Sequence, residues 1–258
     1  MTLRTMIRRA RERDWTGFVI EIVVVVIGVF LGLQASNWNQ DRQESARGRE
    51  YLQRIDADLQ SEISLLRKLR VFSRAVDTYG EAAIAYAENG TLYRNSAWET
   101  ALAYYQASQV WPFRQPNTTF QEIRSSGDLQ LIRNATLRAT IAGHYGDNSN
   151  SHVLEVLGVV PKYRARVRGM TPWPIQRYIW SHCYRSGKDL GQELIDCPSP
   201  VSEAEATTLI KQYRQDTALT AELRFWMATV NTAQFMLAGI QSEAEHVEHD
   251  VRAELARN

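Results

Sequence analysis

The chain has 258 residues, with 30 lysines and arginines against 29 aspartates and glutamates. This near-zero net charge suggests neither a nucleic-acid partner nor a polyanion surface. The length allows one short membrane span followed by a domain with a sizeable core.

The first predicted element is an apolar segment between Trp15 and Trp38. Its residues from Ile22 to Leu33 are apolar without interruption. The two tryptophans are 23 residues apart, which is about 35 Å of α-helix. Because a bilayer core is about 30 Å thick and aromatic side chains favour its interfaces, we expect one transmembrane helix over residues 16–36. The lipid bilayer is thus an expected partner.

Arginines flank this span unequally. Five precede it and three follow it within a similar distance, namely Arg4, Arg8, Arg9, Arg11 and Arg13 before it, and Arg42, Arg47 and Arg49 after it. The bias predicts a short cytoplasmic N-terminus over residues 1–15 and an extracytoplasmic domain over 37–258. In a Gram-negative bacterium, this is a single-pass protein of the inner membrane with a periplasmic domain.

The same N-terminal segment also resembles a cleavable signal peptide, with basic residues, an apolar core and the small residue Ala35. Leu33 is a poor residue three positions before such a cleavage site, and Glu21 interrupts the apolar region. We therefore favour a retained span, and the intact mass of the mature protein distinguishes the two.

Small residues recur every four positions within the span, at Gly28, Gly32 and Ser36. Such a stripe lets two helices approach closely in lipid, and Glu21 lies on the same stripe. One hypothesis is a homodimer or a partner-helix interface, with Glu21 hydrogen-bonded across it. The alternative is that Glu21 reaches the cytoplasmic headgroups and that the glycines are incidental.

Beyond the span, apolar residues at steps of three or four predict a long amphipathic helix that continues the span and ends near Asn89-Gly90. Shorter helices follow, with predicted starts at Ser96, Asn117 or Thr118, Asn134, Ser151, Thr171 and Ser202. A final helix from about Asp216 to Leu255 is long enough to lie antiparallel along the first. No segment alternates convincingly with period two, so the predicted class is all-α, a helical bundle after the membrane helix.

Cys183 and Cys197 flank a polar loop. In an oxidising periplasm they are expected to form a disulfide, which stabilises the fold by about 3 kcal/mol for a loop of about 15 residues. Two unrelated buried thiols in a cytosolic domain are the alternative.

Two motifs resemble a family of bacterial single-span membrane proteins that is known as a domain of unknown function. The first is EIVVVVIGVFLGLQASNWNQDRQ at residues 21–43, followed by the pair Tyr51-Leu52. The second is TTFQEIRSSGDLQLIRNATLRATIAGHY at residues 118–145. The resemblance implies the single-span topology but no activity.

The motifs mark residues near the outer interface and in a turn. Trp38 is expected to anchor in the interface, while Asn37 and Asn39 contact headgroups or a second subunit. Ser125, Ser126 and Gly127 are expected to form a turn in which glycine supplies a positive φ. We favour a structural role for both motifs.

No nucleotide-binding, hydrolase or zinc motif is present in the sequence, and no cofactor is expected. Weak metal candidates are Glu243, His246 and His249, because Glu-x-x-His is the spacing of di-iron bundles. A second such motif is missing, so a solvated helix end is favoured.

An aromatic and basic segment is the other candidate for chemistry. Arg177, Trp180 and Tyr184 share one helical face, near Trp173, and form a possible pocket for an anionic or aromatic ligand. A packed cap of the bundle is the favoured alternative. Taken together, the sequence predicts a domain that mediates interaction, scaffolding or sensing with an unknown membrane or periplasmic protein partner; a membrane-tethered enzyme is the rival hypothesis.

Overall fold

The computed structural model describes residues 15–146, 160–187 and 191–257. Over these residues the fold is all-α, as predicted, apart from one small hairpin. Its elements are α2 (Trp15–Asn89), η1 (Tyr93–Asn95), α3 (Ala97–Gln106), α4 (Thr118–Ser126), η2 (Asp128–Leu131), α5 (Ala135–Tyr145), α7 (Lys162–Met170), α8 (Trp173–His182), β1 (Tyr184–Ser186), β2 (Gln192–Leu194), α9 (Glu203–Gln215) and α10 (Thr217–Arg257).

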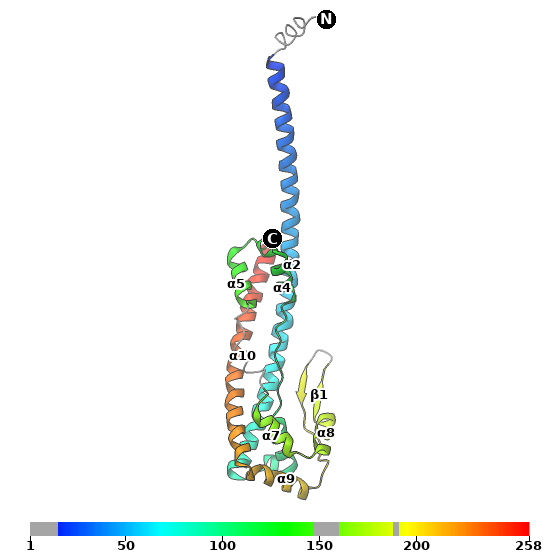
Figure 1. Cartoon of the computed structure of the whole chain (residues 1–258), viewed down its shortest axis with the longest axis vertical. Helices are drawn as coiled ribbons and strands as arrows, with labels where there is room; N and C mark the ends of the chain where they lie inside the picture. Colours follow the sequence, from blue (N-terminus) through cyan, green and yellow to red (C-terminus); the bar gives the residue numbers. More distant parts are fainter. Residues whose placement is uncertain (1–14, 147–159, 188–190, 258) are drawn as a thin grey trace.

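Helix α2 is continuous over 75 residues, which is about 110 Å. Figure 1 shows its first part projecting alone and its second part forming one side of the body. Side chains from Ile20 to Gln43 are exposed, whereas the stripe that begins at Tyr51 is buried. The predicted continuity of the span with the amphipathic helix is therefore confirmed, as is its end at Asn89, where Gly90 takes a φ of 75°.

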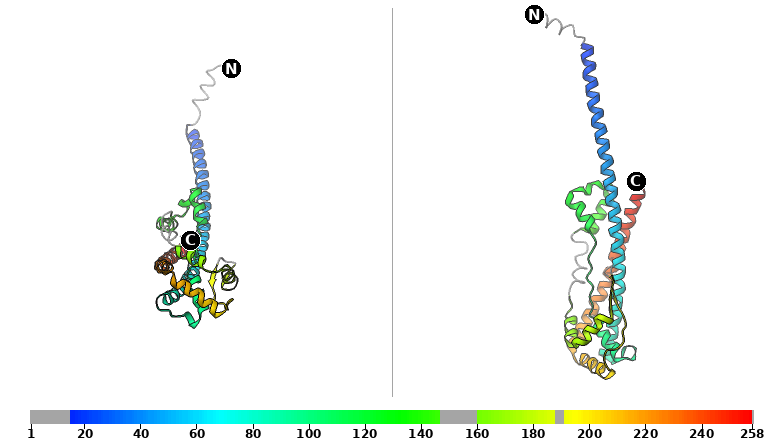
Figure 2. Two further views of the ribbon diagram at one scale, coloured as in Figure 1. Left: turned by 60° about the horizontal axis from the view of Figure 1, so that its bottom comes forward. Right: turned by 90° about the vertical axis from the view of Figure 1, so that its right-hand side faces the viewer.

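Helix α10 lies antiparallel beside α2 along the body, as predicted (Figures 1 and 2). Residues at helical spacing from both helices fill the core between them, for example Leu59 and Leu66 of α2 with Leu237 and Val247 of α10. Their burial supplies most of the stability of the pair, since exposed ion pairs such as Arg67–Glu245 contribute little.

Helices α4 and α5 cover the end of the body that is nearer to the projecting part of α2 (Figure 1). Gly127 ends α4 with a φ of 76°, as expected for this turn. Asn134 caps α5 by accepting a hydrogen bond from the Leu137 amide at 3.1 Å. Helix α4 begins at Thr118 after Asn117, as predicted, although the Asn117 side chain makes no cap bond. Instead Asp58 of α2 accepts from the Thr119 amide at 3.1 Å, which ties α4 to the long helix.

The two sequence motifs meet in space. The Tyr51 hydroxyl, just after the first motif, donates to Asp128 of the second at 2.8 Å, and Arg47 bonds the same carboxylate at 2.6 Å. The hydrogen bond from Tyr51 is the largest cause that lowers the pKa of Asp128. Ser125 and Ser126 donate to carbonyl oxygens of their own helix. These contacts hold the two motifs against each other within the domain.

Gly48 is where α2 and η2 approach most closely. A β-carbon at this position would overlap the carbonyl oxygen of Leu131, which is backbone and has little room to move. We expect Gly48→Ala to destabilise the domain by about 1–3 kcal/mol, despite alanine's better helix propensity. Thermal unfolding of the full chain in mild detergent measures the change.

Gly239→Ala is the matched control, because Gly239 also lies within a long helix and nothing lies within 4 Å of its added carbon. This variant should gain up to about 1 kcal/mol. Equal effects of the two substitutions would contradict a close approach at Gly48.

The far end of the body contains α3, α7, α8, α9 and the hairpin (Figure 1). The capping box at Ser202 and Glu205 is confirmed, and Ser96 caps α3 as predicted. Thr171 does not cap α8 as we expected, because it ends α7 and its hydroxyl contacts the Tyr213 hydroxyl at 2.7 Å. Most of the helix expected from Ser151 lies outside the described residues, and α7 begins at Lys162. The hairpin β1–β2 occupies part of the cysteine loop and was not predicted.

Candidate functional site: an arginine and aromatic cluster

The transmembrane candidates are exposed on the projecting part of α2. Gly28 and Gly32 have nothing within 4 Å of an added β-carbon, so the stripe is an open surface. Glu21, Ser36, Asn37 and Asn39 are exposed in the same region. Trp38 is 64% exposed, and Arg42 lies over its ring at 5.1 Å. The side chain of Trp15 lies outside the described residues.

The predicted aromatic and basic cluster forms, but with a different cation. Arg177 is exposed on α8 and its guanidinium is not the one stacked on Trp180. The guanidinium over the Trp180 ring belongs to Arg168 of α7, at 5.4 Å from the ring centre. The same guanidinium lies 4.9 Å from the ring centre of Tyr105 in α3. Trp180 and Tyr184 pack edge to face at 4.7 Å, so these two predicted residues do come together.

A second arginine, Arg164, lies one turn earlier on α7 and shares an acceptor with Arg168. Arg164 Nη1 donates to Gln109 Oε1 at 3.2 Å and to the carbonyl oxygen of Ser108 at 2.7 Å. Arg168 Nη2 donates to the same Gln109 Oε1 at 3.0 Å. The amide oxygen of one glutamine thus holds two guanidinium groups side by side just after the C-terminus of α3.

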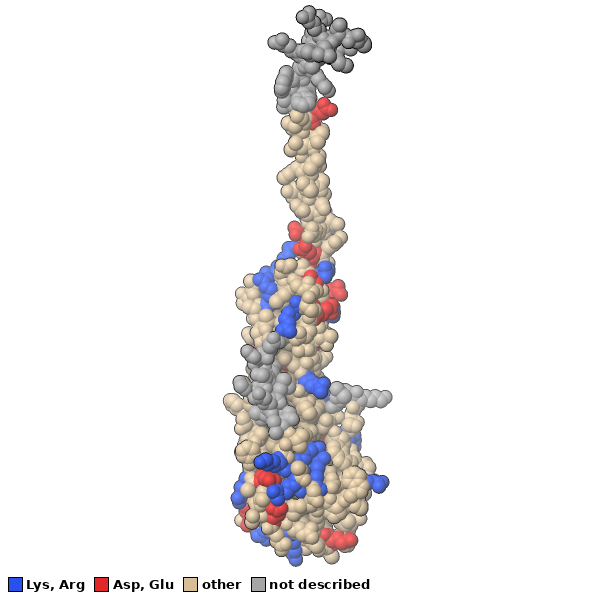
Figure 3. Space-filling view, viewed as in Figure 1, with Lys and Arg blue, Asp and Glu red and all other residues tan. Residues whose placement is uncertain are grey.

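Both guanidiniums are partly buried without an acidic partner. Neither forms an ion pair with a carboxylate of the described residues, and the causes that act on their pKa values include no aspartate or glutamate. Burial, followed by the charge of Arg168, lowers the pKa of Arg164 to about 10. Burial also lowers the pKa of Arg168. Both side chains remain charged at neutral pH, so the cluster carries uncompensated positive charge. Figure 3 shows blue side chains, with a few red ones among them, on this part of the body, where Figure 1 labels α7.

The Tyr105 hydroxyl is a further polar group at the cluster. It is fully buried. Burial is the largest cause that raises its pKa, and the charge of Arg168, a hydrogen bond with Trp180 and the charge of Arg164 oppose this shift. The hydroxyl therefore keeps its proton at neutral pH and can donate.

A buried chain of amides joins the arginines to the disulfide. Gln109 Nε2 donates to Gln106 Oε1 at 3.3 Å, and Gln106 Nε2 donates to the carbonyl oxygen of Cys183 at 2.8 Å. The structure joins Cys183 and Cys197 in a disulfide with a Cα–Cα distance of 5.1 Å. Arg164, Arg168, Tyr105 and Gln109 were not candidates in the sequence, where the one available signal was the pair of arginines four residues apart on α7.

A second polar cluster lies between α2, α5 and α10. Glu62 and His144 are 0% and 1% exposed, and His144 Nε2 is 3.0 Å from Glu62 Oε2. Gln115 Nε2 donates to the other oxygen of Glu62 at 3.0 Å. Glu243 Oε1 is 3.4 Å from His144 Nδ1. No sequence pattern identified this cluster.

The weak metal candidates do not converge. Glu243 contacts His144, whereas His246 and His249 have side chains that are 71% and 80% exposed and lie near Asp250. Over the residues that the structure describes, no group of three histidine, cysteine or acidic side chains is arranged to hold a metal ion.

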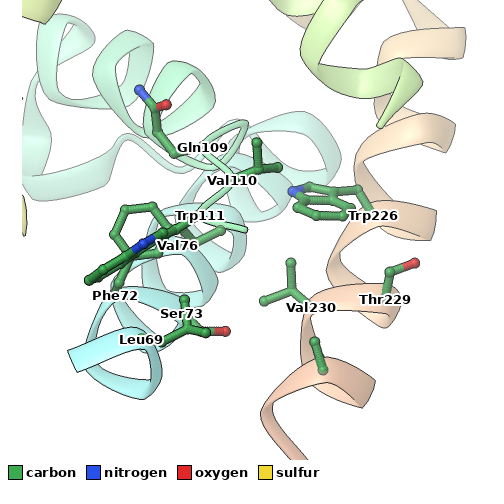
Figure 4. Close-up of a pocket in the computed structure, with 11 residues that line it drawn as sticks. Leu69, Phe72, Ser73, Val76, Gln109, Val110, Trp111, Trp226, Thr229 and Val230 are labelled. Carbon is green, nitrogen blue, oxygen red and sulfur yellow. The ribbon is translucent and has the colours of Figure 1, made fainter. Parts of the chain in front are cut away.

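Figure 4 shows an apolar gap between α2, α10 and the segment that follows α3. Phe72 and Trp111 meet edge to face at 5.5 Å on one side of it. On the other side, Trp226 Nε1 donates to the carbonyl oxygen of Ala107 at 2.8 Å. The gap has a volume of about 20 Å³, whereas small-molecule pockets are about 300–1,000 Å³. It is a packing gap with room for about one water molecule.

Comparison of the chain with protein-family models, curated proteins and solved structures finds no match.

Proposed function

We propose that this protein is a single-pass membrane protein whose helical domain lies outside the cytoplasm and mediates interaction, scaffolding or sensing. The observation that carries the proposal is the change of character along α2. The helix is apolar and exposed up to Leu33 and then becomes one side of a packed body without a break.

A helical segment with exposed apolar side chains on all sides requires lipid or a protein partner around it. The side chains of Ile22, Val24 and Phe30 are 47%, 62% and 58% exposed, and they lie on different sides of the helix. Soluble monomers rarely expose contiguous apolar patches above a few hundred Å². A helix that is apolar on all sides is typical of a membrane span.

The orientation rests on the arginine bias and on the disulfide. Five arginines before the span and three after it favour a cytoplasmic N-terminus. A disulfide between Cys183 and Cys197 favours an oxidising compartment for the domain. Since the cytoplasmic part has about 15 residues, a signal from the domain would have to pass through a second helix in the membrane.

Protease treatment of intact spheroplasts tests the proposed location. With the domain outside the cytoplasm, the added protease degrades it before lysis. Survival of the domain in intact spheroplasts and its digestion only after lysis would contradict the orientation. Extraction of the chain by alkaline carbonate would contradict the span.

Self-association through the span gives a separate prediction. We expect Gly28→Leu/Gly32→Leu to abolish cross-linked dimers, because the larger side chains prevent close approach of two helices. The monomer tolerates both changes, since each glycine faces open space. Val26→Leu/Phe30→Leu on the opposite side of the helix is the control and should leave cross-linking intact. Unchanged cross-linking in the glycine variant would remove the dimer hypothesis.

A further inference from the structure

We propose that Arg164 and Arg168 form a binding site for a small oxyanion of the phosphate class. The inference deepens the proposed sensing role by naming a ligand. The inference depends on the proposed function only for the cellular compartment in which the protein encounters the ligand. The binding itself is a property of the folded domain.

Charge is the first argument for an anion. The cluster holds two guanidiniums on one glutamine oxygen, at 3.2 and 3.0 Å, with no carboxylate of the described residues to balance them. Two like charges at partly buried positions repel each other. The carbonyl oxygen of Ser108, just after the C-terminus of α3, compensates for them only in part. An anion with two charges would neutralise the pair.

Donor geometry is the second argument. Arg164 uses Nη1, and Arg168 uses Nη2 in its close hydrogen bond, so each guanidinium keeps N–H groups with no close bond to a described residue. The Tyr105 ring lies under the Arg168 guanidinium at 4.9 Å and helps to hold it in place. Two neighbouring guanidiniums with remaining N–H groups match the acceptor oxygens of a tetrahedral oxyanion, and arginine binds phosphate in a bidentate way.

Position identifies the source of the anion as a soluble molecule. The neighbouring helix α3 packs on the far part of α2, where the Tyr86 and Tyr104 rings are 6.5 Å apart. Tyr86 is 50 residues beyond Ser36 along the continuous α2, which is about 75 Å. Headgroups of the protein's own membrane are therefore out of reach, and α7 and α8 lie at the end of the body away from the N-terminus (Figure 1).

Calorimetric titration of the detergent-solubilised full chain with inorganic phosphate, at constant ionic strength, tests the site. We expect saturable binding that Arg164→Gln and Arg168→Gln each weaken at least tenfold. Arg114→Gln, an exposed arginine outside the cluster and the groove beside it, should bind phosphate like the unchanged protein. No saturable binding, or equal loss in Arg114→Gln, would overturn the proposal.

Gln109→Glu keeps the test valid if the arginine variants fold poorly. The new carboxylate takes the position of the amide and offsets one of the two positive charges while its oxygen still accepts from both guanidiniums, so phosphate binding should fall without loss of the fold. Retained phosphate binding in a folded Gln109→Glu chain would contradict the site.

Phenyl phosphate distinguishes a free anion from a phosphate ester. A groove lined by Pro174, Arg177 and Trp180 begins beside the cluster and offers room for an organic group. Tighter binding of phenyl phosphate than of inorganic phosphate assigns the ligand as an ester, and equal binding assigns it as the free oxyanion. The titrations use solubilised protein and do not depend on its orientation in the membrane. A failed spheroplast experiment therefore contradicts the proposed location, whereas a failed titration contradicts the binding site.

Discussion

Glu62→Leu is expected to destabilise the domain by about 3–5 kcal/mol, the largest effect of any single change that we consider. The Glu62 carboxylate is fully buried, and both of its oxygens have partners, His144 Nε2 at 3.0 Å and Gln115 Nε2 at 3.0 Å. Its removal leaves the histidine buried without its main counter-charge. Urea unfolding of the full chain in mild detergent, followed by circular dichroism, measures the loss.

The double variant Glu62→Leu/His144→Leu is the control for this pair. An apolar pair of similar volume needs no charge compensation, so the double variant should recover much of the stability that the single variant loses. Purely additive losses would show that the two side chains are not coupled, which would contradict the ion pair.

The same pair predicts how stability changes with pH. Burial is the largest influence and lowers the pKa of His144. The hydrogen bond that His144 donates to Glu62 and the charges of Glu62 and Glu243 outweigh burial, so the net shift of the His144 pKa is above the ordinary value of 6.5. A pKa that is raised on folding stabilises the folded state fully below pH 6.5 and loses that effect as the pH rises through the folded value. The unfolding midpoint should therefore fall as the pH rises above 6.5, and the fall should be absent in Glu62→Leu/His144→Leu.

The long helices follow from local pattern, which is why the sequence predicts them. The apolar stripe of α2, the capping box at Ser202 and the turn at Gly127 each depend on residues within a few positions of one another. The turn at Gly127 can therefore be predicted without knowledge of the tertiary structure. The antiparallel packing of α2 and α10 follows from their matched apolar stripes and lengths.

The polar clusters depend on tertiary packing and are not visible in the sequence. Glu62 and His144 are 82 residues apart and meet only because α5 packs against α2 and α10. Trp180 was identified as a platform for a cation, but the turn after Thr171 brings Arg168 of α7 to it instead of Arg177. The strands of the hairpin have three residues each, too few for a period of two to be recognised.

Removal of the disulfide is the second prediction with a large effect. We expect Cys183→Ala/Cys197→Ala to lower the free energy of unfolding by about 3 kcal/mol, because the unfolded chain regains the freedom of the open loop. Both residues also hold α3 through their carbonyl oxygens, with Gln106 bonded to Cys183 at 2.8 Å and the Trp98 indole to Cys197 at 2.9 Å. Loosening of the loop therefore reaches α3, which carries Tyr105 and ends just before Gln109.

A reductant distinguishes the contribution of the disulfide to stability from that of the packing of the two side chains. Dithiothreitol should lower the urea midpoint of the unchanged protein to nearly that of the double alanine variant, while it leaves the variant itself unaffected. If the bond contributes mainly through loop entropy, the phosphate affinity of the folded variant should change little. A midpoint of the unchanged protein that does not respond to dithiothreitol under unfolding conditions would mean that the cysteines are not bridged in the protein from native membranes. The case for an oxidising compartment would then rest on the arginines beside the span alone.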